Sequence, residues 1–530
     1  MRKGRLRGLF FCLIFFSLLG PEKEKEREEL IRLPRTYKHW LAVSGFAEYE
    51  PDPDYQHAPE EVYEQFLDLK FGIRIHWGIY TVMGLIDTSW PFLFLPSEQK
   101  QAYQEAYKTW NPSGFDAKQW LDFFQRAGVR IFAFTAKHHE GFSMYDTRAR
   151  VVRRVRWIGE GAPKIEKCNL AYSIMESAFA RDVVRELVDE AHRRGVWVDL
   201  YFSLPDWYDA DFRPYGFHPL SCWKKYFHPV KYGWIPNKRL ELFPLFAHRL
   251  ERFDPVYNWR SWCKEVAFPR FAPAPGEEEK QRMMARLRTQ LLELAVKYQP
   301  EMLCLDLWLG GEVWLELKQI IKEVRRAHPR VMFRVRGIGN YGDYFTPERA
   351  IPGRRKKTIM TWMVIYPLAR SFAYDPDPAQ YKGARWMIHN LIDVVSKGGV
   401  FMPAIGPDAE GRFHPEAVQQ FEEVGRWLEI NGEAIYYTRP WKYWREGNEI
   451  RFTRSKDKKY VYALVLGELK KEFRSRYLSP LAGSEIYLLG YPKPLKWKRQ
   501  EGELVVEIPK QVVLNPPCSY AWVLKLKVGQ

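Results

Sequence analysis

An aspartate within an apolar stretch is the first residue whose surroundings point to chemistry. Asp306 lies in MLCLDLW (302–308), between two leucines. Burying a carboxylate there is costly unless the group is paired or functional. Arg334 and Arg336 end the next apolar stretch, and either could pair with it. Such a partner would lower the pKa of Asp306 and keep it ionised, as a nucleophile or stabilising anion requires. A salt-bridged core aspartate fits the same pattern.

A second carboxyl group is needed if the chemistry is glycosidic hydrolysis, which uses one ionised and one protonated acid. Glu348, in GDYFTPER (342–349), is the best second candidate, with Asp343 as runner-up. The alternative is that Glu348 is an acid in the first turn of a helix. Thr346 would then be the N-cap and Pro347 the first helical residue.

Two adjacent histidines stand in KHHEGF (137–142), where a predicted strand breaks at Gly141. Both His138 and His139 can line a pocket at such a break, although a pair of buried or surface histidines would look the same. A metal site would need further ligands at tetrahedral spacing, and none are evident. We therefore expect neutral imidazoles that bind substrate, with no metal and no cofactor. Without a glycine-rich phosphate loop or a GxSxG elbow, NTPase and serine hydrolase activities have no support.

The elements that must position these residues alternate between apolar strands and amphipathic helices. The predicted strands are 71–78, 129–139, 196–207, 302–308 and 331–337, and the predicted helices are 116–128, 180–195, 282–300 and 312–329. This alternation indicates a parallel sheet. Polar residues gather at the carboxyl ends of the strands, namely His76, Lys137, His138, His139, Ser203, Asp206, Asp306, Arg334 and Arg336. An α/β fold with a (β/α)8-like barrel builds its active site there.

The chain divides into three parts. Residues 1–20 have a basic start and an 11-residue apolar run, which predicts a signal peptide or an N-terminal anchor, and a secreted or periplasmic protein. Residues 21–440 form the expected catalytic barrel, with an aromatic-rich insertion around 208–275 that we expect to be a lid or specificity loop. Residues 441–530 contain short alternating strands, typical of a β-sandwich. A stable membrane span is expected only if the leader stays uncleaved.

Composition narrows the class of protein. The 530 residues are 46% hydrophobic and 28% charged, which excludes a disordered or multi-span membrane protein. The net charge of +17 is spread along the chain, so we interpret it as a solvated surface and expect no nucleic acid partner. Aromatic residues reach 16%, which suits sugar binding. The sequence leaves open whether the protein forms a homo-oligomer.

Six segments also carry a family resemblance. They read FGIRIHWGIYTV, AGVRIFAFTAKHHEGFSMYDT, RDVVRELVDEAHRRGVWVDLYFSLPDW, LLELAVKYQPEMLCLDLW, VVSKGGVFMPAIGPDAEGRF and WLEINGEAIYYTRPW. Together and in this order they resemble the α-L-fucosidases of glycoside hydrolase family 29, over roughly residues 60 to 441. The resemblance implies a (β/α)8-like barrel with a β-sandwich. It also implies hydrolysis of terminal α-L-fucose with retention, without metal or cofactor, on a fucose-containing oligosaccharide, polysaccharide or glycoconjugate.

The resemblance also implies roles for individual residues. Asp306 would be the nucleophile, and the interval to Glu348 is similar to the spacing of nucleophile and acid/base in bacterial members. Four residues would bind sugar hydroxyls: His76, His138, His139 and Tyr201. Arg336 would lie beside the site, and Trp90 and Phe372 would match aromatic residues of the sugar pocket.

Several positions depart from the family pattern. Ser89 precedes Trp90 where the family has Glu, Glu140 replaces the Asp of the KHHDGF motif, and Cys304 replaces an aromatic residue. Val400 and Ala404 replace asparagines. These changes keep two alternatives open beside a fucosidase. One is the same chemistry on an α-L-galactoside or a sulfated fucose-containing polysaccharide, and the other is a non-catalytic carbohydrate-binding relic.

Overall fold

The computed structural model describes residues 52–158, 163–213, 276–307, 309, 313–353 and 361–528. The expected leader (1–20) and most of the expected insertion (208–275) lie outside these residues. Within the described part of the chain, no helix combines the length and the hydropathy needed to cross a membrane.

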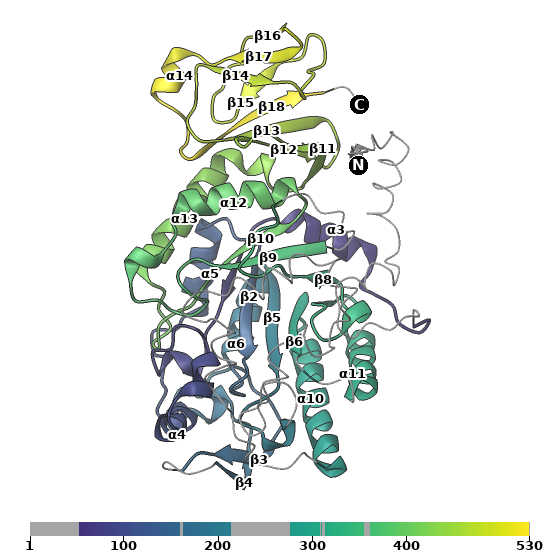
Figure 1. Ribbon diagram of the computed structural model, residues 1–530, viewed down its shortest axis with the longest axis vertical. Coiled ribbons are helices and arrows are strands. Elements are labelled where there is room, and N and C mark those ends of the chain that lie inside the picture. The colour runs from purple at the N-terminus through teal and green to yellow at the C-terminus, as the bar shows by residue number, and fades with distance from the viewer. Residues whose placement is uncertain are drawn as a thin grey trace, which may run out of the picture.

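Eight parallel strands form the centre of the larger domain, in the order β7-β6-β5-β2-β1-β10-β9-β8 (Figure 1). Their bounds are β1 Gly72–Ile75, β2 Ile131–Lys137, β5 Trp197–Leu204, β6 Met302–Leu307, β7 Met332–Phe333, β8 Tyr344–Phe345, β9 Thr361–Pro367 and β10 Val400–Ile405. A parallel bridge between Arg334 and Tyr344 links the two outermost strands and brings the sheet round on itself. The expected (β/α)8-like barrel is confirmed.

Amphipathic helices surround the barrel and bury their apolar faces (Figure 1). They are α5 Ala117–Arg126, α6 Val183–Arg193, α10 Glu277–Lys297, α11 Trp314–Ala327, α12 Ala384–Ser396 and α13 Pro415–Asn431. Helix α5 shows how the sequence sets such an element. The Asp116 carboxylate caps it by accepting a hydrogen bond from the backbone N–H of Gln119, while Trp120, Leu121 and Phe124 face the core.

Successive side chains of a strand point to opposite faces, so every second residue points into the barrel, and these residues form layers. Along β6, the alternate residues Met302, Cys304 and Asp306 face inward. Met302 belongs to an apolar layer with methionines and small residues of other strands. In the middle layer, Cys304 Sγ accepts long hydrogen bonds from Arg74 at 3.5 Å and Arg334 at 3.6 Å. Asp306 occupies the layer above, at the carboxyl end of the strand, where a barrel builds its site.

The C-terminal part consists of two antiparallel sheets with a separate apolar core. One sheet has the order β11-β12-β13-β18-β15 and the other β14-β17-β16. Their bounds are β11 Thr438–Glu446, β12 Ile450–Ser455, β13 Tyr460–Leu466, β14 Glu472–Ser475, β15 Ile486–Leu488, β16 Trp497–Gln500, β17 Glu503–Glu507 and β18 Ala521–Lys527. The five-stranded sheet docks on α12 and α13 (Figure 1), where Arg451 contacts Asp393 at 2.7 Å and Trp427 donates to the Ala521 carbonyl.

Candidate active site

Asp306 is held by a donor from β5 and a donor from the turn that follows β7. Its Oδ1 accepts a hydrogen bond from Arg336 Nη1 at 2.8 Å, and its Oδ2 accepts one from the Tyr201 hydroxyl at 2.7 Å. Burial by itself would raise the pKa of this carboxyl, but the charges of Arg336 and Arg334 outweigh burial and place the pKa well below its ordinary value. The group is therefore an ionised, oriented carboxylate at neutral pH.

Glu348 lies beside the same guanidinium group. Its Oε2 accepts hydrogen bonds from Arg336 Nη2 at 2.9 Å and from Arg334 Nη2 at 3.4 Å. Because Arg336 contacts Asp306 through one terminal nitrogen and Glu348 through the other, one side chain joins the two carboxyl groups. Retaining glycosidases place their carboxyl groups about 5–5.5 Å apart, and a shared guanidinium fits a short separation of that kind.

The helical alternative for Glu348 is wrong. The segment pairs with β9 instead, because Arg349 donates its backbone N–H to Ile365 O and Ile365 donates to Pro347 O, each at 3.0 Å. These two backbone bonds hold Glu348 in a parallel bridge opposite Ile365. The local Thr-Pro-Glu pattern resembles a helix start, but pairing with a strand later in the chain overrides it.

Asp343, the runner-up, is excluded by its surroundings. The side chain is fully buried and accepts hydrogen bonds from Arg325 Nη2 at 2.6 Å, from the backbone N–H of Phe333 at 2.7 Å, and from the Tyr63 hydroxyl. Burial would raise its pKa, but Arg325 reverses the shift and places it well below the ordinary value. Asp343 thus ties α3 (Glu60–Leu69) to the β7 region as a structural carboxylate.

The residues expected to bind a sugar surround Asp306 as a connected group of rings. His138 stacks on Tyr201 with centroids 5.4 Å apart, and His76 packs on Phe372 at 4.9 Å. Trp90 meets His139 edge-on at 5.0 Å. The structure therefore brings all nine candidate residues into one site.

Several buried polar atoms in this group have no hydrogen-bond partner among the described residues. They are His76 Nδ1, His139 Nε2 and Ser203 Oγ. Buried polar atoms are rarely left unpaired, so a cluster of them indicates a site where a ligand supplies the partners. Burial lowers the pKa of His76 and His138 well below the ordinary value, and that of His139 to about 4. The rings are thus neutral at pH 7 and can donate or accept hydrogen bonds to hydroxyl groups.

Sequence reasoning missed Trp207 as a residue of the site. Its ring stacks on His139 with centroids 5.2 Å apart and meets Trp90 at 5.4 Å. Its indole Nε1 is buried with no partner among the described residues. The signal was present, because Trp207 ends the stretch 196–207 that carries Asp206, but its ring could not be placed without the loop conformation.

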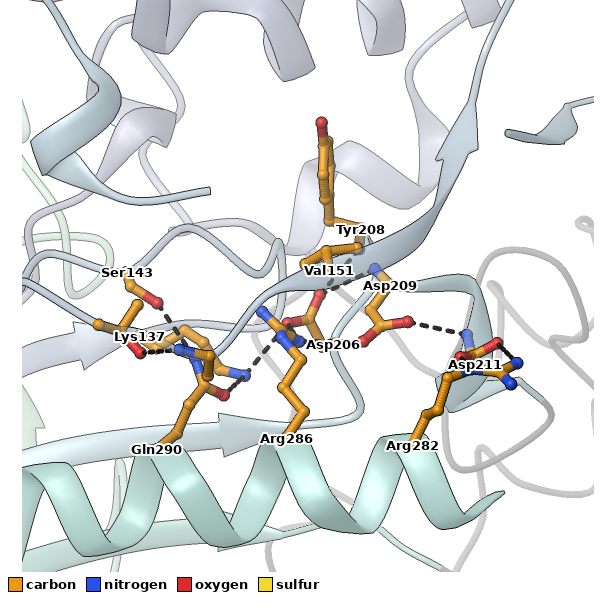
Figure 2. A network of polar contacts seen from close by, with 12 residues as sticks. Lys137, Ser143, Val151, Asp206, Tyr208, Asp209, Asp211, Arg282, Arg286 and Gln290 are labelled. Atoms are coloured by element: carbon orange, nitrogen blue, oxygen red, sulfur yellow. Dashed lines mark hydrogen bonds and ion pairs between the residues drawn. The ribbon is translucent and has the colours of Figure 1, made fainter. Parts of the chain in front are cut away.

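A buried ionic network around Asp206 lies next to the site (Figure 2). Lys137 Nζ contacts Asp206 Oδ2 at 3.1 Å, and Arg286 Nη1 contacts the same oxygen at 2.6 Å. The peptide next to Asp206 then binds the histidine directly, because the Pro205 carbonyl accepts from His139 Nδ1 at 3.1 Å. Lys137 and Asp206, which the sequence placed at strand ends, therefore support His139 through the Pro205 peptide.

Comparison with known proteins agrees with this architecture. Residues 42–433 match the α-L-fucosidase family model, and residues 446–527 match the model of the α-L-fucosidase C-terminal domain. The chain is a glycoside hydrolase and belongs to the α-L-fucosidase family.

Sequence identity between this chain and individual relatives is low. Rat plasma α-L-fucosidase is 25% identical over 498 residues, covering 87% of this chain and 90% of that protein. Bovine tissue α-L-fucosidase is 26% identical over 490 residues, with 87% of each chain covered. Among solved structures, α-L-fucosidase isoenzyme 1 from Paenibacillus thiaminolyticus has a TM-score of 0.66 and 21% identity, over 89% of this chain and 99% of that one. A family 29 enzyme from Bacteroides thetaiotaomicron, solved as a trapped covalent intermediate, has a TM-score of 0.65 and 20% identity, over 91% and 100%.

Proposed function

We propose that this protein removes terminal α-L-fucosyl residues from oligosaccharides, polysaccharides or glycoconjugates by a retaining mechanism. The observation that carries the proposal is the pair of carboxyl groups joined by Arg336: Asp306 at 2.8 Å and Glu348 at 2.9 Å from its two terminal nitrogens. Family membership supports the sugar, because the plasma and tissue relatives are named α-L-fucosidases.

The geometry supports specific roles in two steps. Asp306 attacks the anomeric carbon while Glu348 gives its proton to the leaving oxygen, which forms a glycosyl-enzyme ester and frees the aglycone. Glu348 then takes a proton from water, the water oxygen attacks the anomeric carbon, and Asp306 leaves as a carboxylate. Arg336 and Tyr201 orient Asp306 throughout and stabilise its negative charge when it departs.

The test is a stereochemical one. An aryl α-L-fucoside is incubated with the purified protein, and the anomer released first is identified by proton NMR. Release of α-L-fucose supports the proposal. First release of the β anomer would contradict retention, and binding of L-fucose without turnover would indicate a carbohydrate-binding relic.

A related sugar is the second candidate, and the middle layer of the barrel favours it. Cys304, where the family has an aromatic residue, lies between the buried guanidinium groups of Arg74 and Arg334, so the floor below Asp306 is polar. Kinetics on aryl α-L-galactosides, and salt-dependent binding to a sulfated fucan, test this candidate. A higher kcat/KM for the galactoside than for the fucoside would favour it, and no binding to the fucan at low salt would exclude the sulfated chain.

We also propose that residues 1–20 direct the protein out of the cytoplasm. A basic n-region followed by an apolar run supports export. N-terminal sequencing of the exported protein tests this, and an intact Met1 on a membrane-bound product would instead support an anchor.

A further inference from the structure

Glu140 is a buried acid at the edge of the site that the mechanism does not use. Only 4% of the residue is exposed, and its Oε2 has no hydrogen-bond partner among the described residues. Its Oε2 lies 3.7 Å from Nδ1 of His138, one of the histidines of the sugar site. A buried carboxyl that touches a binding residue and forms no ion pair with a lysine or arginine among the described residues needs a physical account.

Ser89 connects these two groups. Its hydroxyl oxygen is 2.5 Å from His138 Nδ1, and it also lies against the Glu140 carboxyl group. A hydroxyl can donate to one neighbour while it accepts from the other. The three groups therefore form a short chain from an acid, through a hydroxyl, to one nitrogen of a neutral imidazole ring.

The other nitrogen of that ring, His138 Nε2, makes no hydrogen bond to any described residue. His138 also stacks on Tyr201, whose hydroxyl donates to Asp306, so the ring lies over the reaction centre. In a neutral imidazole, the bond made at one nitrogen decides whether the other nitrogen donates or accepts.

We propose that the proton on Glu140 sets, through Ser89, which ring nitrogen of His138 is protonated, and so determines whether His138 Nε2 donates to or accepts from a substrate hydroxyl. This inference deepens the proposed function of the same site. With Glu140 protonated, the acid donates to Ser89, Ser89 donates to His138 Nδ1, and Nε2 keeps its proton. When Glu140 loses its proton to solvent, Ser89 donates to the carboxylate instead. The ring proton then moves from Nε2 to Nδ1, so the imidazole stays neutral.

The surroundings make this change accessible near neutral pH. Burial raises the pKa of Glu140 to about 8. The groups that face it from other elements are Tyr80, Tyr103, Tyr172, Asp206 and Lys137. Burial raises the pKa of the three tyrosines well above 10, so they stay neutral. The pKa of Asp206 is held well below its ordinary value despite burial, by Arg286 and Lys137. Lys137 is the one other group in this set that titrates in the same pH range, because burial lowers its pKa to about 8.

The decisive measurement reads the tautomer directly and needs no turnover. Protein labelled with ¹⁵N-histidine is studied by long-range ¹H–¹⁵N correlation at about pH 6.5 and about pH 9.5, and His138 is assigned by its loss in H138Q. We expect a proton on Nε2 at the lower pH and on Nδ1 at the higher pH. Glu140→Gln should keep the Nε2–H form at both, and Ser89→Ala should abolish the dependence on Glu140. An unchanged tautomer in the wild type, or a change that persists in E140Q, overturns the proposal.

Kinetics provide a second test that separates this inference from the proposed function. On an aryl α-L-fucoside, kcat/KM of the wild type should fall above about pH 8, and this fall should disappear in E140Q. Near neutral pH, kcat/KM of E140Q should be less than about tenfold below that of the wild type. If the fall persists in E140Q, another group such as Lys137 or the general acid Glu348 causes it, and the inference fails while the fucosidase proposal stands. If the wild type has no activity, the proposed function fails, and the spectra still decide the tautomer.

Discussion

Arg336 Nη2 lies 2.9 Å from Glu348 Oε2, and Nη1 of the same guanidinium group lies 2.8 Å from Asp306 Oδ1. Because the guanidinium is rigid and planar, it fixes the two carboxyl groups relative to one another. It also stabilises negative charge on both carboxyl groups. Arg336 therefore links the two carboxyl groups to which the proposed mechanism gives roles.

Replacing the proposed nucleophile should abolish the glycosylation step. Asp306→Gly is expected to lower kcat by several orders of magnitude, because no other described carboxyl group is oriented by both Arg336 and Tyr201. Azide should enter the vacated space, restore part of the activity on an activated fucoside and give a fucosyl azide of inverted configuration. The measurement is steady-state kinetics with product NMR. Turnover near the wild-type level without azide would end the assignment.

The effect of replacing the proposed acid/base should depend on the leaving group of the substrate. Glu348→Ala should slow substrates with poor leaving groups by about 10²–10⁴-fold, and activated aryl fucosides far less, because only poor leaving groups need a proton. Asp343→Asn is the matched control, since that carboxylate is structural. It should lower the melting temperature and leave the leaving-group dependence unchanged. An equal effect of E348A on both substrate classes would contradict the assignment.

Glu140 should make stability depend on pH. Its pKa is about 8 in the native protein against 4.5 for an ordinary glutamate, so the native state binds more protons than the unfolded state between these values. Stability therefore falls as pH rises through this window, by a few kcal/mol at most. The free energy of unfolding of E140Q minus that of the wild type should grow from about pH 5 to about pH 8 in denaturant titrations. A constant difference would show that Glu140 is ionised throughout.

Gly141 should tolerate no side chain. Its φ is +89°, and a Cβ there would lie 2.1 Å from Asp206 Oδ1, a member of the network next to the site. Gly141→Ala should displace Asp206 and cost well over the roughly 1–2 kcal/mol expected from backbone strain alone. Gly195→Ala is the control, because Gly195 has φ +67° with open space around it. If thermal unfolding shows equal losses for both variants, the steric argument is wrong.

Chelation should leave activity unchanged. Among the residues the structure describes, no group of three or more His, Cys, Asp or Glu side chains is arranged to hold a metal ion. His138 is instead engaged through Nδ1 by Ser89, and His139 through Nδ1 by Pro205. Activity on an aryl α-L-fucoside before and after dialysis against EDTA is the measurement. A loss that zinc or calcium restores would show a metal that these residues do not account for.

Local sequence patterns were enough to predict the barrel and much of the site. The alternation of strands and helices predicted the fold, because the periods of 2.0 and 3.6 are local properties of the chain. Parallel strands end on one side of a barrel, so the polar residues at their carboxyl ends had to meet there, including His76, His139 and Asp306. The pairing of Asp306 with an arginine also followed, since buried charges need partners.

Which partners meet was decided only by the tertiary structure. Arg336 rather than Arg334 binds Asp306, and Glu348 pairs with β9 although its local sequence suits a helix start. Asp343 differs from Glu348 by only five positions, yet it is turned toward α3 and fully buried. The contact of Ser89 with His138 joins residues 49 positions apart. Local periodicity sets which face of an element is buried, but contacts between distant segments depend on strand register and loop path, which only the folded chain determines.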